Sequence, residues 1–247
     1  MADTTKLINL KLIVSLFNKM SYVYEVKNVL PADYCKHLID KFEKSNCKMQ
    51  GICGSGENTV KRNIKMSTDL DIVQSPSFKN ELDYILKIIN PHISAFFKNF
   101  DKNIKNYYST TAKSINKPYS SWIQIQRTKK GEYFEWHSDY STKDDRRLAF
   151  ILYLNTLDEN DGGETEFMDG KIVRPEVSKL IIFPSTWTNY HRGREVLGKT
   201  KYILTGFVCN TEREKSIGQN IYKDVVKDKL SGNPKPKHFG GKASMLW

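Results

Sequence analysis

The second half of the chain consists of short apolar stretches separated by turn residues. From Trp122 onward these stretches are rich in Ile, Leu, Tyr, Phe and Thr, with Gly, Asp, Asn or Pro between them. Stretches of this length and composition are typical of β-strands joined by tight connections. The predicted strands are 122–127, 148–154, 164–167, 180–183 and 202–209. Short strands in such close succession predict an antiparallel sandwich or barrel.

The first hundred residues have mostly helical patterns instead. Residues 22–26 alternate like one short strand. Pro31 suits a first helical turn, and the spacing of the apolar residues after it predicts a helix through Phe42. A second helix is expected from Ser77, whose hydroxyl can cap it, to Pro91, which should end it. The predicted fold class is therefore α+β with a mainly β core and N-terminal supporting helices.

A chain of 247 residues predicts one large domain with extensions. We assign residues 1–110 to a helical support region of that domain, 111–211 to the β core and 212–247 to a basic C-terminal extension. The extension has eight basic residues against four acidic ones. Its composition favours a mobile tail, and a lid over a substrate site is the alternative.

The net charge of +11 has two interpretations. It could serve a polyanion partner such as nucleic acid, or it could belong to a lysine-rich, solvated surface. The absence of a basic run of five or more residues favours the second interpretation.

The cysteines and the apolar runs bear on localisation. Four cysteines without a CxxC pair or a zinc spacing indicate a reduced, cytoplasmic environment. No apolar run approaches the ~18 residues that cross a bilayer, so no membrane partner is expected. Residues 7–17 are broken by Asn9 and Lys11, and they predict a packed amphipathic segment rather than a signal peptide.

His137, Asp139 and His191 form a candidate metal-binding set. Residues two apart on an extended segment project from the same side, and a distant strand can supply the second imidazole. Two histidines and one carboxylate occupy one face of an octahedron and leave three positions open, as in non-heme Fe(II) sites. Hydrogen-bonded His/Asp pairs in an ordinary β domain would show the same sequence pattern. The spacing alone therefore leaves both a metal site and a structural hydrogen bond open.

Lys201 begins the last predicted strand, ten residues after His191. A cation at the inner end of a barrel can hold the far carboxylate of a dicarboxylic acid by a charge-assisted hydrogen bond. Lys199 competes for this role.

Five sequence segments stand in order around the candidate ligands. They are 131–139 (GEYFEWHSD), 147–155 (RLAFILYLN), 162–167 (GGETEF), 181–184 (IIFP) and His191 through Lys201-Tyr202. In order and spacing, over roughly residues 120–210, these segments resemble the Fe(II)/2-oxoglutarate dioxygenases of the prolyl 4-hydroxylase type.

The resemblance implies a double-stranded β-helix (jelly roll) in which His137, Asp139 and His191 hold iron. It also implies that Lys201 pairs with the far carboxylate of 2-oxoglutarate. The implied reagents are Fe(II), 2-oxoglutarate and O2, and ascorbate is a further candidate. The implied reaction couples oxidative decarboxylation of 2-oxoglutarate, giving succinate and CO2, to hydroxylation of a C–H bond.

Two positions depart from the family pattern. Thr128 stands nine residues before the first histidine, where the family often has a tyrosine that touches 2-oxoglutarate. Phe207 stands where a tryptophan is frequent. Thr128 shares a strand face with Gln124 and Gln126, so a small hydroxyl and an amide are expected to replace the phenol. Thr205, four residues after the lysine, is expected to add a further hydrogen bond.

The resemblance favours a prolyl residue of a peptide or protein as substrate. Tyr133, Trp136, Trp187 and Tyr190 lie close to the ligands in sequence and could form an aromatic groove, although core packing would give the same pattern. Arg62 is a candidate for the substrate entrance, where related enzymes have a comparable arginine. A plain surface arginine is the favoured alternative.

Two other functions stay open. One is a 2-oxoglutarate oxygenase that acts on nucleic acid or a small molecule, but nucleic-acid demethylases typically carry arginines after the distal histidine and do not usually show GGETEF. The other is a non-catalytic jelly-roll binding module. The presence of all three ligand types and Lys201 makes it the weaker alternative.

Overall fold

The computed structural model describes residues 22–53, 61–101, 119–140 and 146–209. The predicted amphipathic segment at 7–17 and the basic extension at 212–247 lie outside these residues. The predicted domain boundaries at 110/111 and 211/212 also fall outside them, and they stay predictions.

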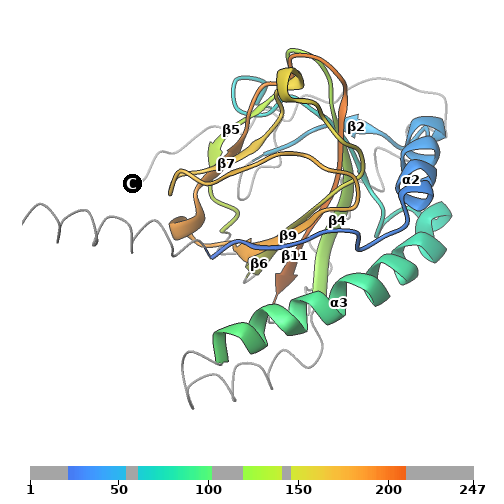
Figure 1. Ribbon diagram of the computed structural model, residues 1–247. Helices are drawn as coiled ribbons and strands as arrows, with labels where there is room; N and C mark the ends of the chain where they lie inside the picture. The colour runs from blue at the N-terminus through green and yellow to red at the C-terminus, as the bar shows by residue number, and fades with distance from the viewer. Residues whose placement is uncertain (1–21, 54–60, 102–118, 141–145, 210–247) are drawn as a thin grey trace, which may run out of the picture. The chain divides into compact units, whose positions relative to one another are not determined.

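Two antiparallel sheets form the centre of the described structure (Figure 1). The larger sheet has the strand order β1-β9-β6-β11-β4-β3-β2, and the smaller one has the order β5-β10-β7-β8. The large-sheet strands are β1 (Tyr24–Val26), β2 (Met49–Gln50), β3 (Thr68–Asp71), β4 (Tyr119–Thr128), β6 (Arg146–Tyr153), β9 (Leu180–Pro184) and β11 (Lys201–Cys209). The small-sheet strands are β5 (Phe134–His137), β7 (Thr165–Phe167), β8 (Ile172–Val173) and β10 (His191–Gly193). The predicted α+β jelly roll is confirmed.

Two helices cover one face of the large sheet (Figure 1). These are α2 (Ala32–Lys44) and α3 (Lys79–Asp101), the latter preceded by the short helix η1 (Pro76–Phe78). Two further short helices, η2 (Glu159–Asp161) and η3 (Trp187–Asn189), lie in the connections of the β core. The apolar faces of α2 and α3 pack against outward-facing residues of β3, β4, β6, β9 and β11.

The second helix differs from the prediction at both ends. Ser77 lies inside η1 and does not cap α3, and α3 continues through Pro91 to Asp101. A proline inside a helix costs about 3 kcal/mol, because it lacks an N–H and crowds the preceding turn. Here buried apolar residues continue on both sides of it, from Ile85 to Phe96, and their burial against the sheet outweighs that cost.

Successive side chains along each strand of the large sheet point to opposite faces of the sheet. On β11, Leu204 and Val208 pack under the helices, whereas Ile203 and Phe207 pack toward the small sheet. The inner core between the two sheets also contains Phe167 of β7 and Phe183 of β9. The same period places Lys201 on the inner face, and this position determines the site described below.

An ion pair fastens the end of α2 to the large sheet. Arg127 of β4 donates to both carboxylate oxygens of Glu43, at 3.0 and 2.8 Å, and the Tyr202 hydroxyl donates to the same carboxylate at 2.8 Å. We expect Glu43→Ala to lower the free energy of unfolding by about 2 kcal/mol, because it leaves a largely buried guanidinium without this partner. Urea denaturation measures the effect. The control Asp40→Ala, which removes an exposed pair with Lys36 on the same helix, should change it by less than about 0.5 kcal/mol.

Candidate active site

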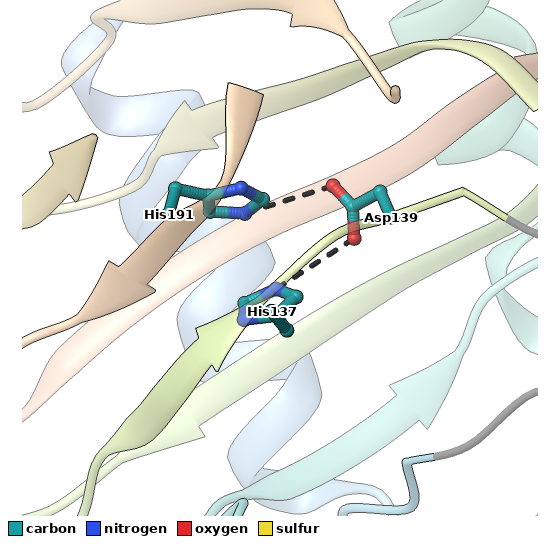
Figure 2. Close-up of side chains that lie close together, drawn as sticks. All are labelled: His137, Asp139 and His191. Atoms are coloured by element: carbon teal, nitrogen blue, oxygen red, sulfur yellow. Dashed lines mark ion pairs between the residues drawn. The ribbon is translucent and has the colours of Figure 1, made fainter. Parts of the chain in front are cut away.

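Two paired strands of the small sheet bring the three candidate ligands together. His137 at the end of β5 lies directly opposite His191 on β10, and Asp139 follows β5 by two residues. One donor atom from each of the three side chains lies within 4.8 Å of the others. Figure 2 shows the carboxylate of Asp139 facing both imidazoles, with Oδ1 3.7 Å from His137 Nε2 and Oδ2 3.6 Å from His191 Nε2. These separations are longer than hydrogen bonds, and the donor set can hold a divalent metal ion.

The other ring nitrogens fix the tautomers of both histidines. His137 Nδ1 lies 2.7 Å from the Glu135 carbonyl oxygen, and His191 Nδ1 lies 3.0 Å from the Asn189 carbonyl oxygen. A carbonyl oxygen only accepts, so each Nδ1 carries the proton and each Nε2 presents a lone pair to the site. Burial, and then the neighbouring His191, hold the pKa of His137 well below its usual range, which favours the neutral imidazole that a metal requires.

Aromatic rings enclose the histidines. The Phe134 ring stacks on His137 with centroids 3.6 Å apart and planes inclined by 14°. His191 is 4% exposed and lies between Phe167 and Phe183, at centroid distances of 5.5 and 4.9 Å. These contacts limit rotation of the imidazoles and keep water away from their faces.

Lys201 is buried on the inner face of β11, with 5% of its surface exposed. No acidic side chain of the described ranges lies within 4.0 Å of its Nζ. Burial lowers the pKa of Lys201 to about 8, partly opposed by Glu164. Burying an unpaired ammonium is costly, so this position suits an anionic group such as the far carboxylate of 2-oxoglutarate. Lys199, the competing candidate, is exposed and pairs with Asp158.

Tyr153 lies near Lys201, although its position in the sequence suggested no role in the site. It is fully buried on β6, its ring centroid lies 5.8 Å from Lys201 Nζ, and its hydroxyl donates to Thr165 Oγ1 at 2.7 Å. Burial raises the pKa of Tyr153, so it stays a neutral phenol. The period-two pattern of Ala149, Ile151 and Tyr153 would have indicated this inward-facing hydroxyl.

The polar side chains expected on β4 share the inner face with Lys201. Thr128 lies directly opposite Lys201, and Gln126 and Gln124 lie opposite Ile203 and Thr205. Directly opposite residues of an antiparallel pair point to the same side of the sheet.

The two threonines near Lys201 differ in what they can offer a ligand. The Thr205 hydroxyl already donates to the Phe150 carbonyl oxygen at 2.8 Å, so it can only accept a hydrogen bond from a ligand. Thr128 is therefore the better placed of the two threonines to donate to a carboxylate.

The proposed substrate-side residues are only partly brought together. Residues 64–66 run along β5, and the Tyr133 hydroxyl donates to the carbonyl oxygen of exposed Arg62 at 3.4 Å. Trp187 in η3 is 77% exposed. Trp136 lies on the outer face of the small sheet, with the Arg192 guanidinium 4.9 Å from its ring. The expected groove of four aromatic residues therefore does not include Trp136.

Phe207, at the position where a tryptophan is frequent, contacts an arginine near the candidate metal ligands. The Arg146 guanidinium lies 4.0 Å from the Phe207 ring, and Nη1 of the same arginine lies 3.4 Å from the Asp139 carbonyl oxygen. The phenyl ring thus packs at the end of β11 that lies near Asp139.

The depressed pKa of Lys201 predicts a pH-dependent stability. At pH values between about 8 and its ordinary value of 10.5, the unfolded chain holds a proton on this lysine that the folded protein has lost. The free energy of unfolding should therefore rise across this window, by up to about 3 kcal/mol from Lys201. Denaturant unfolding at pH 8 and pH 10 measures the rise. It should be smaller in Lys201→Met and in wild type saturated with 2-oxoglutarate, and an equal rise in Lys201→Met would contradict this assignment.

Comparison with known protein families gives a match over the β core. Residues 123–209 match the model of the 2OG-Fe(II) oxygenase superfamily. The 2-oxoglutarate and iron-dependent oxygenase domain-containing protein 3 of Mus musculus is 26% identical over 182 residues, which cover 72% of this chain and 49% of the relative. A PKHD-type hydroxylase of Synechococcus is 28% identical over 91 residues, 35% of this chain and 40% of the relative. The chain spans about half the length, or less, of these curated relatives.

Solved structures of prolyl hydroxylases have a similar fold. A Trichoplax adhaerens prolyl hydroxylase, in complex with a peptide fragment of the hypoxia inducible factor oxygen degradation domain, superposes with a TM-score of 0.60 at 13% identity, covering 85% of this chain and 94% of that one. The viral collagen prolyl hydroxylase of Paramecium Bursaria Chlorella virus-1 gives a TM-score of 0.55 at 20% identity, with coverages of 76% and 96%. At these identities the similarity shows a shared fold.

Proposed function

We propose that this protein is an Fe(II)- and 2-oxoglutarate-dependent dioxygenase that hydroxylates a prolyl residue in a peptide or protein. The match of residues 123–209 to the model of the 2OG-Fe(II) oxygenase superfamily supports the reaction class. The observation that carries the proposal is the convergence of His137, Asp139 and His191 within 4.8 Å at the small sheet. Lys201 is buried on the inner face of the large sheet, without an acidic partner among the described residues. Members of this superfamily use Fe(II), 2-oxoglutarate and O2.

His137, Asp139 and His191 would hold Fe(II) through two neutral Nε2 atoms and one carboxylate. The bound metal, with 2-oxoglutarate and O2, supplies the oxidising power for an unactivated C–H bond and yields succinate and CO2. The protein contributes the geometry. The Glu135 and Asn189 carbonyl oxygens orient the two imidazoles, and the surrounding phenylalanines exclude water from them.

Lys201 would orient 2-oxoglutarate by its far carboxylate. A charge-assisted hydrogen bond from Nζ would satisfy a buried ammonium that has no acidic partner in the described part of the chain. Thr128, opposite it in register, can donate a second hydrogen bond. Tyr153 is held by Thr165 and lines the same region of the interior.

A prolyl substrate is supported by the similar structures and by exposed groups near the ligands. The two structures named above are prolyl hydroxylases, one of them bound to a peptide fragment and the other a collagen prolyl hydroxylase. In this chain Arg62, Tyr133 and Trp187 are the residues that we propose for contacts with the peptide. Arg62 and Trp187 are exposed, and Arg62 is held next to β5 by Tyr133.

The charge of the described residues gives little support to a nucleic-acid substrate. They contain 23 basic and 20 acidic residues, so they carry +3 of the chain's net charge of +11. A surface that binds polyanions would concentrate basic residues. Binding of DNA or RNA that weakens steeply with salt would favour the nucleic-acid alternative.

The second alternative is a jelly-roll binding module without activity. Such a module would bind Fe(II) and peptide but form no succinate.

Neither helix of the described ranges is long and apolar enough to span a bilayer. A cytoplasmic location and the absence of a membrane partner stay predictions.

Mass spectrometry of prolyl peptides after incubation tests the proposal. The protein with Fe(II), 2-oxoglutarate and ascorbate should add one oxygen atom to a proline and release an equal amount of succinate. Matched peptides with alanine in place of proline should not gain oxygen. Succinate release without oxygen on any prolyl peptide would instead favour a small-molecule or nucleic-acid substrate.

A further inference from the structure

A buried ion pair lies on the inner face of the large sheet. Lys65 Nζ is 2.6 Å from Asp69 Oδ2, and the two side chains are 3% and 5% exposed. Asp69 pairs in register with Gln126, so it points to the same side of the sheet as Gln126 and Ile203. The hydroxyl of Ser67 donates to Asp69 Oδ1 at 2.8 Å, so both carboxylate oxygens have partners.

The backbone of Gly51, the residue after β2, covers this ion pair. Gly51 donates its N–H to the Ser67 carbonyl oxygen at 2.9 Å. A Cβ atom at Gly51 would lie 2.2 Å from Ser67 Oγ and 3.2 Å from both Lys65 Cε and Asp69 Oδ2. The absence of a side chain at position 51 therefore lets the backbone approach and exclude water from the pair.

The ion pair is connected to a metal ligand through one aromatic ring. Lys65 forms a β-bridge with Phe134, and its Nζ lies 5.2 Å from the centroid of the Phe134 ring. The same ring stacks on His137 with a centroid distance of 3.6 Å. The contacts thus run without interruption from Asp69 through Lys65 and Phe134 to His137.

Stability alone gives no reason for this pair. Desolvation of two buried charges offsets most of their attraction, and apolar replacements of similar volume are often neutral or stabilising. A desolvated cation near an aromatic ring, in contrast, has a directional attraction that restrains the ring.

We propose that the Lys65–Asp69 pair is a positioning element for His137 and acts through Phe134. Asp69 fixes the Lys65 ammonium, the ammonium restrains the Phe134 ring, and the stacked ring restrains the imidazole plane. The hydrogen bond from Nδ1 to the Glu135 carbonyl oxygen restrains the same imidazole at its edge. Together they keep Nε2 directed at Asp139. This inference rests on the proposed iron site.

Co(II) binding to the purified protein tests the inference without reference to turnover. The test variants are the uncharged double substitution Lys65→Met/Asp69→Asn, which leaves no buried charge unpaired, and Phe134→Leu, which removes the stacked ring. Each should raise the Kd for Co(II) by about tenfold or more, since groups that orient metal ligands are typically worth 10–100-fold in affinity. The visible spectrum of bound Co(II) should shift in both variants.

The control is a second Lys–carboxylate pair far from the ligands. Lys41 Nζ lies 2.6 Å from Glu81 Oε1 between α2 and α3, so Lys41→Met/Glu81→Gln removes the same kind of bond. This control should leave Co(II) affinity and spectrum unchanged, even where thermal unfolding shows an equal loss of stability.

The outcomes separate the two proposals. Wild-type Co(II) affinity and spectrum in Lys65→Met/Asp69→Asn would overturn the positioning role. If that variant does not fold, an unchanged Kd in Phe134→Leu would overturn it instead. No Co(II) binding by the wild-type protein would overturn the proposed iron site, and this inference with it.

Discussion

The Asp139→Ala variant should lose 2-oxoglutarate turnover by at least about 1000-fold, since the metal ligands act as one unit. Asp139 supplies the negatively charged donor that faces both imidazoles, so its loss removes one of three ligands. Succinate formation with saturating Fe(II) measures the effect. Thermal unfolding should show an intact fold, because Asp139 lies outside both apolar clusters.

Two further variants complete this test. Asp139→Asn retains the shape but not the charge, and it should be impaired as well. Asp169→Ala removes an exposed carboxylate in the turn between β7 and β8, and it should retain wild-type turnover. Turnover by Asp139→Ala near the wild-type rate would refute the assignment of this ligand.

The Lys201→Met variant should raise the KM for 2-oxoglutarate by about two orders of magnitude. Methionine fills a similar volume but cannot pair with a carboxylate, and loss of one partner of a buried charge pair typically costs 2–5 kcal/mol. Steady-state kinetics with varied 2-oxoglutarate measures the change. The affinity for Co(II) alone should stay near the wild-type value, because Lys201 is not a proposed ligand.

Lys199→Met is the matched control for this prediction. Lys199 is two residues away, is exposed and pairs with Asp158, so its substitution should leave KM unchanged. If Lys199→Met raised the KM and Lys201→Met did not, the cosubstrate would bind elsewhere.

Much of the β core could be predicted from local pattern. Five predicted strands coincide with β4, β6, β7, β9 and β11 to within three residues at each end. Three of these strands, β6, β9 and β11 of the large sheet, bury both faces, one against the helices and one against the small sheet, so their apolar runs are distinct.

The strands that carry the ligands could not be predicted in this way. β5 reads Phe-Glu-Trp-His and β10 reads His-Arg-Gly, and both are short, half polar and paired only with distant segments. Local propensity is a weak guide where such pairing decides the structure. The sequence spacing of His137, Asp139 and His191 indicated a metal-binding set. Their proximity, however, results from the register in which β5 pairs with β10.

The Lys65–Asp69 pair was missed for a related reason. A lysine and an aspartate four residues apart suggest an exposed pair on a helix, whereas here the chain enters β3 and the pair is buried between strands. The resemblance to known dioxygenases was carried by residues 120–210, and these two residues precede that region.

Anaerobic absorption spectroscopy tests the central claim most directly, namely that one site holds both the metal and 2-oxoglutarate. Adding 2-oxoglutarate to the Fe(II)-loaded protein should produce a visible charge-transfer band, because a 2-oxo acid that chelates Fe(II) absorbs in this region. The band should be absent in Asp139→Ala and should need about a hundredfold more 2-oxoglutarate in Lys201→Met. An undiminished band in Asp139→Ala, or no band in the wild-type protein, would contradict the account.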